Sequence, residues 1–331
     1  MRLVRNEPTV AVLIPCFNEE RTVGDVVRRF RAALPDAVVY VYDNNSRDLS
    51  ALRARAAGAV VVREARQGKG HVVRRMFADI DADIYLMADG DGTYAPEDAG
   101  ALVNALVTER ADMVVGTRRG VEDDAGRAGH AFGNRLFNTL YRRLFGADFS
   151  DIFSGYRAFS RRFVKSFPAV SGGFEIETEM SVHASQLMLP VVEIALDYGR
   201  RPQGSVSKLS TWRDGGKILW TFALLAKETQ PLRFFGALAA LFLVSSLALM
   251  SPVLLEYAAT GLVPRLPTWM LSIALSIFAM LMAATGLVLD SVARMRIEQK
   301  RMAYLNADAA RMVALPLPGL DPAVEPLRAT A

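Results

Sequence analysis

The sequence has little cysteine or histidine: one cysteine and three histidines among 331 residues. A single cysteine, Cys16, excludes an intramolecular disulfide, and because it ends an apolar run we expect an inert buried thiol. His71, His130 and His183 fall in helical patterns without the spacing of metal ligands, so we interpret them as structural. The sequence therefore predicts no metal centre built on cysteine or histidine.

The sequence also shows no long internal repeat and no strongly basic pattern, and we expect no signal peptide. The apolar run near the start is short, and Pro15 and Asn18 interrupt it too early for a signal peptide. The formal net charge is only +4, and no basic stripe with interleaved aromatic residues is found, so we expect no nucleic-acid partner. Low complexity is confined to an Ala/Pro-rich tail from about residue 307, which is predicted to be disordered.

Apolar residues are what the chain has in excess. Hydrophobic residues make up 51% of the sequence, and the mean hydropathy of +0.19 is too high for a purely soluble enzyme. The excess lies in two runs, Phe234–Tyr257 and Trp269–Leu289, the first uncharged until Glu256 and the second without charge. Each is long enough for a helix to cross about 30 Å of hydrocarbon. We therefore predict a hairpin of two transmembrane helices, and disfavour two buried core helices because soluble helices normally show a polar face.

Basic residues around the two runs predict the orientation of the hairpin. The connecting loop carries only Arg265, whereas further basic residues flank the outer ends of the runs: Lys217, Lys227, Arg233, Arg294, Arg296, Lys300 and Arg301. Cytoplasmic segments of membrane proteins are enriched in Lys and Arg. We therefore expect a multi-pass protein of the inner (plasma) membrane with both chain ends in the cytoplasm.

The composition divides the chain into four segments. Residues 1–212 form a predicted α/β domain, residues 234–290 the hairpin, and residues 291–331 a cytoplasmic basic helix followed by the tail. Residues 213–233 alternate large apolar and basic residues at helical spacing, which predicts an interfacial amphipathic segment with Trp220 at headgroup depth. Its cations would lie against anionic membrane lipids.

Between residues 9 and 115 the chain alternates apolar strands with helical patterns. Strands are predicted at Val10–Ile14, Val38–Tyr42, Val60–Val62, Ile84–Met87 and Met113–Val115, with helices near 19–33, 47–57, 69–80 and 97–109. This rhythm favours a mainly parallel sheet with helices on both faces. Ligands bind such sheets at the carboxyl ends of the strands, where polar clusters follow the first four strands.

Two aspartates, Asp89 and Asp91, stand one residue apart where the fourth strand ends. Neighbouring glycines and a proline stop the strand and start a turn. Carboxylates at a strand end can bind a hard divalent cation such as Mg²⁺ or Mn²⁺, which takes one or two carboxylates together with waters and phosphate oxygens. The pair therefore suggests a metal-bound nucleotide diphosphate, and an ordinary Asp/Gly turn is the alternative.

Seven motifs occur in order before the hairpin: IPCFNEE, VYDNNSRD, RQGKG, MADGDGTYAP, VVGTR, DIFSGYRAF and GSVSKL. This series resembles glycosyltransferase family 2, and within it the dolichol-phosphate mannose synthase-like and bacterial polyprenyl-phosphate glycosyltransferases. The resemblance covers about residues 8 to 212. It implies a GT-A type nucleotide-sugar domain, a nucleotide-sugar donor, a polyprenyl phosphate acceptor and a divalent cation, Mg²⁺ or Mn²⁺.

The resemblance places four residues at the base and ribose of the donor. These are Pro15, Asn18, Glu19 and Asp43. Asn18 precedes two acidic residues, so it can also be an N-cap of the following helix. For Asp43, which lies at a strand end rather than a helix start, we favour contact with the ligand.

The donor diphosphate is expected between the third and fourth strand ends. Arg66 and Lys69 lie in a glycine-flanked basic turn that opens a helix, which suits a diphosphate, although a solvated turn is the commoner role of such a segment. The resemblance implies that Asp89 contacts ribose or metal and that Asp91 binds the metal. Thr93 stands where mannose synthase-type members often have glutamine.

The acceptor side also requires cations. A lipid phosphate brings a second anion beside the leaving diphosphate, so positive side chains must neutralise both. Arg118 and Arg135 match the family positions for this role. The loop that closes over donor and acceptor in the family matches four further residues: Arg200, Arg201, Ser207 and Lys208.

Acidic residues of the second half leave two interpretations open. Asp151 compares with the general base of inverting transferases, yet a phosphate monoester has a second pKa near 6 and needs little deprotonation. Asp151 would then orient the sugar or a basic partner. Among Glu175, Glu177 and Glu179, either one residue touches a sugar hydroxyl or all three form an exposed helix start.

The sequence thus predicts an inverting enzyme that transfers one sugar from a nucleotide-sugar to polyprenyl (undecaprenyl-type) phosphate at the cytoplasmic membrane face. Three alternatives stay open: a processive polysaccharide synthase subunit, a transferase acting on protein or lipid headgroups, and a catalytically inactive membrane scaffold for a flippase. The first is suggested by Gln230-Pro-Leu-Arg233-Phe234, a near match to the QxxRW pattern of the family. A homo-oligomer or a flippase partner is compatible with each.

Overall fold

The computed structural model of the protein describes residues 8–119, 149–173, 175–199, 224 and 227–307. The chain divides into two compact units. The first unit comprises residues 1–124, 148–205 and 303–331, and the second comprises residues 125–147 and 206–302.

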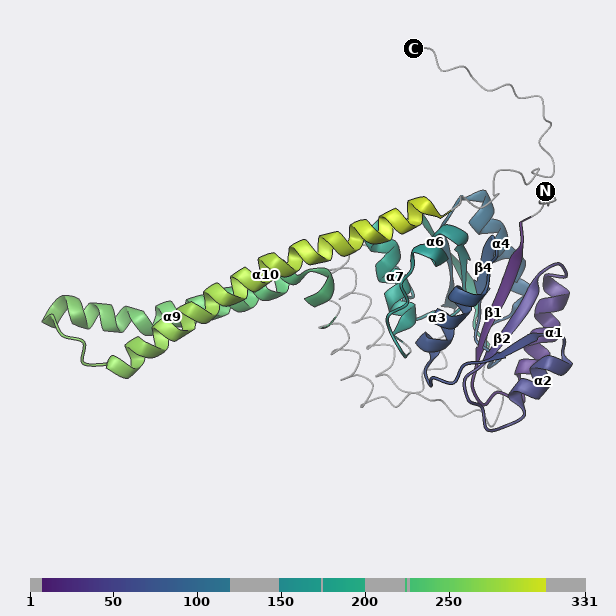
Figure 1. Ribbon diagram of the computed structural model, residues 1–331, viewed down its shortest axis with the longest axis horizontal. Helices are drawn as coiled ribbons and strands as arrows, with labels where there is room; N and C mark the ends of the chain where they lie inside the picture. Colours follow the sequence, from purple (N-terminus) through teal and green to yellow (C-terminus); the bar gives the residue numbers. More distant parts are fainter. Residues whose placement is uncertain (1–7, 120–148, 174, 200–223, 225–226, 308–331) are drawn as a thin grey trace, which may run out of the picture. The chain divides into compact units, whose positions relative to one another are not determined.

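The first unit contains a seven-stranded sheet with the strand order β3-β2-β1-β4-β6-β5-β7 (Figure 1). Only β6 runs antiparallel to its neighbours, β4 and β5. The strands span Val10–Cys16 (β1), Val38–Asp43 (β2), Val60–Arg63 (β3), Ile84–Met87 (β4), Met113–Arg119 (β5), Arg157–Ser160 (β6) and Val191–Asp197 (β7). The predicted mainly parallel α/β fold is confirmed.

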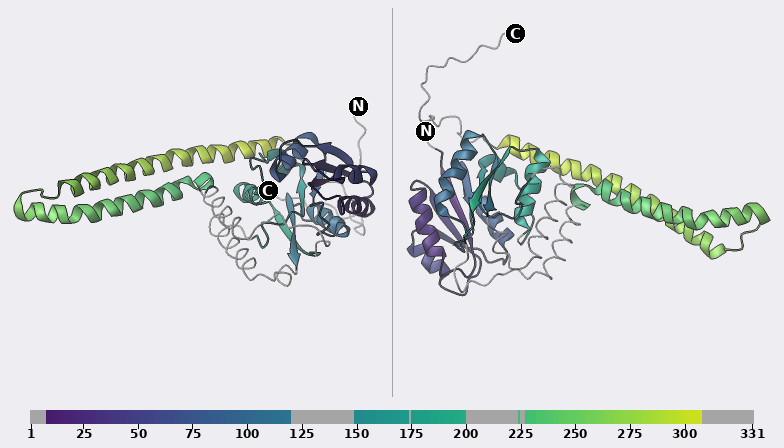
Figure 2. Two further views of the ribbon diagram at one scale, coloured as in Figure 1. Left: turned by 90° about the horizontal axis from the view of Figure 1, so that it is seen from below. Right: turned by 180° about the vertical axis from the view of Figure 1, so that it is seen from behind.

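Helices cover both faces of this sheet, as Figures 1 and 2 show. On one face lie α1 (Val23–Ala33), α2 (Ser50–Ala56) and α4 (Ala99–Thr108), the last preceded by the 3₁₀ turn η1 (Pro96–Asp98). The other face carries α3 (Lys69–Asp79), α6 (Arg161–Ser166) and α7 (Ile176–Leu187).

Alternating side chains of the central strand β1 build the core on both faces. Val12 and Ile14 pack with the apolar side of α1, including the fully buried Phe30. Successive strand residues point to opposite faces, so Leu13, also fully buried, lies on the side of α3. Each such large apolar side chain contributes about 1.5–3 kcal/mol on burial.

The start of α1 differs from the prediction. The helix begins at Val23 instead of near residue 19, and Asn18 is not its N-cap. Asn18 has a positive φ of 52°, and its Oδ1 accepts from the Arg47 amide at 2.8 Å. The Asn18 amide in turn donates to Ser46 Oγ at 2.9 Å. The chain after β1 is thus tied to the chain after β2, and this pairing displaces the helix start.

The two cores contain the cysteine and one histidine that the sequence marked as structural. Cys16 is buried at the end of β1, and burial raises the pKa of its thiol well above the usual range. His183 is fully buried on α7, with its ring edge-on to Phe163 and Phe167 and its Nε2 3.0 Å from Ser166 Oγ. His71 lies near the start of α3, and His130 lies outside the described residues.

The second unit contains two long apolar helices, α9 (Pro231–Thr260) and α10 (Leu266–Asn306), of which the last residues belong to the first unit. Both are long and apolar enough to cross a membrane, and only 11% and 17% of their most apolar windows are buried. They cover the two predicted runs and extend beyond them at both ends.

Small and polar residues join α9 to α10, which lie side by side (Figures 1 and 2). Four buried residues of α10 recur every seventh position: Ser272, Ala279, Gly286 and Ala293. Ser246 Oγ of α9 donates to the Ser272 carbonyl at 2.7 Å. A Cβ on Gly286 would lie 3.0 Å from Phe235 Cβ, so the helices approach closely at this point, as small residues allow in membranes.

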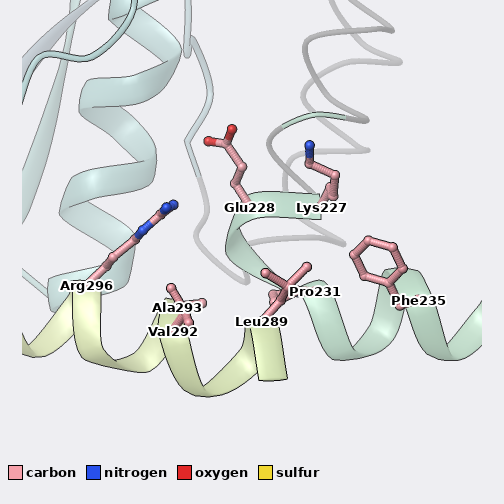
Figure 3. Close-up of a pocket in the computed structure, with 8 residues that line it drawn as sticks. All are labelled: Lys227, Glu228, Pro231, Phe235, Leu289, Val292, Ala293 and Arg296. Carbon is pink, nitrogen blue, oxygen red and sulfur yellow. The ribbon is translucent and has the colours of Figure 1, made fainter. Parts of the chain in front are cut away.

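Residues just before α9 line a small cavity together with residues of α9 and α10. A cavity of about 230 Å³ lies there (Figure 3), and the apolar side chains of α9 and α10 lie along it. Three charged residues also line it: Lys227, Glu228 and Arg296. The interfacial amphipathic segment at residues 213–233 stays a prediction, because most of it lies outside the described residues.

Candidate active site

The carboxyl ends of four parallel strands meet at one edge of the sheet. Cys16 of β1 pairs with Asp43 of β2, which pairs with Arg63 of β3, and β4 flanks β1 on the other side. The segments that follow these strands therefore lie next to one another. They contain the predicted donor residues except two: Pro15 is buried within β1, and Asp43 is the last residue of β2.

Asp43 is a buried carboxylate at this edge, with 6% of its surface exposed. Its Oδ2 accepts from the Ser46 amide at 3.3 Å, while Oδ1 has no hydrogen-bond partner among the described residues. Buried polar atoms are normally paired, so an unpaired carboxylate oxygen suits a ligand that donates an N–H or O–H.

Asn44, which the motif analysis did not single out, holds the RQGKG turn. Its Nδ2 donates to the Arg66 carbonyl at 2.7 Å, and its Oδ1 accepts from the Gly68 amide at 2.7 Å. The side chain of Arg66 is exposed at the edge of the turn. A buried asparagine directly after a strand was the available signal for this role.

The glycines of the turn are required by close packing against residues 171–172. Gly68 has a φ of +132°, and a Cβ there would lie 2.1 Å from the Gly172 carbonyl oxygen. A Cβ on Gly70 would lie 2.1 Å from the Ser171 carbonyl oxygen. The chain before α7 therefore covers one side of the turn, so the turn is not open to a phosphate on all sides.

Lys69 points from this turn toward two carboxylates. Its Nζ lies 2.5 Å from Asp89 Oδ1 and 2.6 Å from Glu177 Oε1, and only 8% of the side chain is exposed. Burial by itself would lower the pKa of Lys69, but the two carboxylates outweigh it and raise the pKa well above its ordinary value. Lys69 therefore stays positively charged, and its ammonium forms ion pairs with Asp89 and Glu177.

The Asp89-Gly-Asp91 segment is held from two sides. Thr22 Oγ1 donates to the Gly90 carbonyl at 2.7 Å, and a Cβ on Gly90 would lie 2.6 Å from Glu19 Oε2. Asp91 is buried, and its Oδ1 accepts from the Thr93 hydroxyl at 2.6 Å and from the Thr93 amide at 3.1 Å. Thr93 therefore orients Asp91. Thr93 itself stands at the position where mannose synthase-type members often have glutamine.

The donor set at Asp89 and Asp91 fits a hard divalent cation that is completed by phosphate. Within the described ranges, no group of three or more His, Cys, Asp or Glu side chains could enclose a metal. Mg²⁺ is commonly bound by one or two carboxylates, with waters and substrate phosphates as the other ligands. The side chain of Asp89 is 30% exposed, which leaves it accessible to such a ligand.

Arg118 and Asp151 form a bidentate ion pair. Arg118 Nε donates to Asp151 Oδ2 at 2.7 Å and its Nη2 donates to Oδ1 at 2.8 Å. The guanidinium also lies over the Tyr198 ring, 5.5 Å from its centre. Burial alone would raise the pKa of Asp151, but the contacts with Arg118 lower it below the usual value. Asp151 is therefore a weak base that has the basic partner required by the second interpretation.

The loop that carries Asp151 is fixed against the Lys69–Asp89 pair. A Cβ on Gly155 would lie 2.8 Å from Asp89 Oδ2 and 3.2 Å from Lys69 Nζ. The Gly155 amide donates to the Tyr94 hydroxyl at 2.9 Å. Burial, reinforced by Asp89, raises the pKa of Tyr94 well above its ordinary value, so the hydroxyl stays protonated.

Arg157 supports this loop from inside the protein. The side chain is fully buried and donates to the Ile152 carbonyl at 2.7 Å, the Ser154 carbonyl at 2.8 Å and Ser181 Oγ at 3.0 Å. The role of Arg157 was not predicted from the sequence. The available signal was an arginine directly before the apolar pair Ala158-Phe159 of β6.

The three glutamates before and within α7 have different environments. Glu175 is exposed, Glu179 accepts from the amides of Val170 and Ser171, and Glu177 is buried against Lys69. The interpretation as an exposed helix start is therefore wrong for Glu177, because α7 packs against α3 at this point.

Five predicted acceptor-side residues lie outside the described residues. They are Arg135, Arg200, Arg201, Ser207 and Lys208. The same holds for most of the predicted interfacial segment and for the tail beyond residue 307. Arg118 is the one predicted acceptor-side cation within the described part of the chain, and its position near Tyr198 and Asp151 is given above.

The mainly parallel sheet, the aspartate pair after β4 and the likeness to solved glycosyltransferase structures together identify the fold as GT-A. Residues 11–167 match the family described as glycosyl transferase family 2. The chain is also 39% identical over 230 residues to glycosyltransferase AglJ of Haloferax volcanii, a match that covers 69% of this chain and 75% of that protein. The chain belongs to glycosyl transferase family 2, which confirms the resemblance found in its motifs.

Two further proteins are similar to more than half of the chain. Undecaprenyl-phosphate mannosyltransferase of Micrococcus luteus is 27% identical over 226 residues, which covers 61% of this chain and 87% of that protein. Glucosyl-3-phosphoglycerate synthase from Mycobacterium tuberculosis, crystallised with Mg²⁺ and UDP, has a TM-score of 0.50 and 27% identity and covers 59% of this chain and 73% of that chain. The bound metal and nucleotide accord with the divalent metal dependence of GT-A enzymes.

Proposed function

We propose that the protein transfers a single sugar, with inversion, from a nucleotide-sugar to polyprenyl phosphate at the cytoplasmic face of the membrane. The observation that carries this proposal is the presence in one chain of a GT-A site and two adjacent, largely exposed apolar helices. A lipid acceptor would require both the transferase site and the apolar helices. The similarity to an undecaprenyl-phosphate mannosyltransferase supports the same acceptor class.

On the donor side, the carboxylates have separate tasks. Asp43 offers its unpaired Oδ1 to the nucleoside, and Asp89 and Asp91 would hold the divalent cation. That cation, when bound, would neutralise the charge that develops on the leaving diphosphate. Lys69 fixes the orientation of Asp89 through their ion pair instead of contacting the diphosphate directly.

On the acceptor side, the phosphate itself is the nucleophile. A phosphate monoester is largely ionised at neutral pH, so Asp151 does not have to remove a proton. Asp151 holds the guanidinium of Arg118 in a bidentate contact, and this cation lies where a second anion could approach beside the donor. Arg135 and the loop residues 200–208 are proposed to complete the cationic surface.

The acceptor proposal can be tested in membranes that contain the protein. We expect one of labelled UDP-, GDP- or CDP-sugars, incubated with undecaprenyl phosphate, to label the lipid extract only when the protein and a divalent cation are present. Matched membranes with the Asp91→Asn variant should give background label. Label that appears instead in protein, in polymer or in headgroup lipids would exclude polyprenyl phosphate as the acceptor.

The hairpin gives a separate prediction about topology. A cysteine introduced at Leu262, in the exposed turn between α9 and α10, should react with an impermeant maleimide from outside intact spheroplasts. Cysteines at positions 5 and 325 should react only after lysis, because basic flanks stay in the cytoplasm. The native Cys16 is buried and serves as a silent background. Labelling of position 262 only after lysis would exclude the two-span arrangement.

A further inference from the structure

Glu177 is a buried acid that the reaction as described above does not use. It lies in the first turn of α7 with 4% of its surface exposed. Its Oε1 contacts Lys69 Nζ at 2.6 Å, and its Oε2 has no hydrogen-bond partner among the described residues. Burying an ionised acid costs free energy unless a group of opposite charge compensates it.

The contacts of Lys69 make this acid part of a three-residue group with Asp89. The ammonium lies between Asp89 Oδ1 and Glu177 Oε1, at 2.5 and 2.6 Å. Gly155 covers the pair closely, since a Cβ there would fall within 3.2 Å of Lys69 Nζ. Of the three side chains, only that of Asp89 is substantially exposed, at 30% against 8% for Lys69 and 6% for Glu177.

The net charge of this three-residue group depends on Glu177. Two carboxylates and one ammonium carry a net charge of −1, and the exposed member, Asp89, presents that charge outward. Lys69 and Asp89 alone would be neutral, so an incoming cation would be attracted to Asp89 more weakly. Buried charges are screened weakly by salt, so the difference would persist at physiological ionic strength.

We propose that Glu177 is a positioning residue that compensates the charge of Lys69, so that the three-residue group presents a net negative charge to a divalent cation at Asp89. Lys69 fixes the orientation of Asp89, but its positive charge would weaken the binding of a cation there. The negative charge of Glu177 offsets this loss of metal affinity. The inference rests on the proposed metal site at Asp89 and Asp91, but it does not depend on the identity of the acceptor.

Direct Mn²⁺ binding to the purified full-length chain in detergent tests the proposal. Free Mn²⁺ is measured by electron paramagnetic resonance in the presence of UDP and, in parallel, GDP. We expect Glu177→Gln to weaken Mn²⁺ binding by about fivefold or more, the scale of one unit charge acting on a divalent ion in a solvent-like medium. The double variant Lys69→Met/Glu177→Gln restores the net charge of −1, and its affinity should return to within about twofold of the unaltered chain.

Two further variants separate charge from packing. Glu177→Asp keeps the charge but shortens the side chain, so it should bind Mn²⁺ more tightly than Glu177→Gln even if its melting temperature is lower. Glu175→Gln, on the exposed side of the same helix start, should bind Mn²⁺ as the unaltered chain does.

The possible outcomes are distinct. Unchanged Mn²⁺ affinity in Glu177→Gln, or a double variant no tighter than that single variant, would overturn the role of Glu177 while leaving the metal site intact. An unaltered chain that binds no Mn²⁺ with either nucleotide would overturn both the metal site and this inference. Recovery in the double variant would support it, because a purely structural role predicts further loss from the second substitution.

Discussion

Replacing Asp91 by asparagine is expected to slow sugar transfer at least about a hundredfold and to remove the response of the residual rate to Mg²⁺ or Mn²⁺. Asp91 is buried, with Oδ1 held by the hydroxyl and amide of Thr93. An amide of the same size keeps the volume of the side chain, but it cannot balance the charge of a cation bound to a diphosphate. Turnover of the donor across a metal titration is the measurement.

Asp98→Asn is the matched control for this experiment. Asp98 lies in the η1 turn on the same segment, is partly exposed, and makes no side-chain hydrogen bond at the start of α4. Its activity and metal response should stay close to those of the unaltered chain. An Asp91→Asn protein that is fully active with an unchanged metal response would show that the cation does not bind this carboxylate.

Replacing Arg157 by methionine is expected to lower the free energy of unfolding by about 2–4 kcal/mol, because two buried carbonyls lose their donors. The guanidinium bonds the carbonyls of Ile152 and Ser154 inside the protein. These carbonyls belong to the loop that places Gly155 against Asp89, so transfer should fall together with stability. Pulse proteolysis across a urea series, which reports the folded fraction without tryptophan signals, measures the change.

The control is Arg55→Met on the exposed surface of α2. A surface substitution of this kind changes stability by no more than about 0.5 kcal/mol. If Arg157→Met unfolded at the same urea concentration as Arg55→Met, the buried arginine would not support the loop, and the fixed position of Gly155 would need another cause.

The first five strands and their first residues could be predicted from sequence because they depend on local patterns, whereas of the predicted last residues only Met87 agrees. The first residue of each of the five predicted strands agrees with the structure, and the aspartate pair follows β4 as expected. The two long apolar helices were likewise visible as uncharged runs. Each of these features is set by neighbouring residues, whose periodicity and turn chemistry the sequence displays directly.

The contacts between side chains within the site could not be predicted in the same way. Glu177 meets Lys69 only because α7 packs against α3, and three glutamates at alternate positions give no indication of which one turns inward. The N-cap assignment of Asn18 failed for a related reason, since the side chain bonds a loop that follows a different strand. Pairing between distant segments is decided by tertiary packing, which a local pattern does not contain.

The proposed reaction is tested most directly by the mass of the lipid product. The purified chain, reconstituted in nanodiscs with undecaprenyl phosphate and the donor that labels membranes, should convert the lipid to a species heavier by one sugar residue. The Asp91→Asn chain should leave the lipid unchanged, and no species with two or more added sugars should accumulate. A ladder of longer products would indicate a processive synthase. Donor consumption without any change in the mass of the lipid phosphate would contradict the proposed acceptor outright.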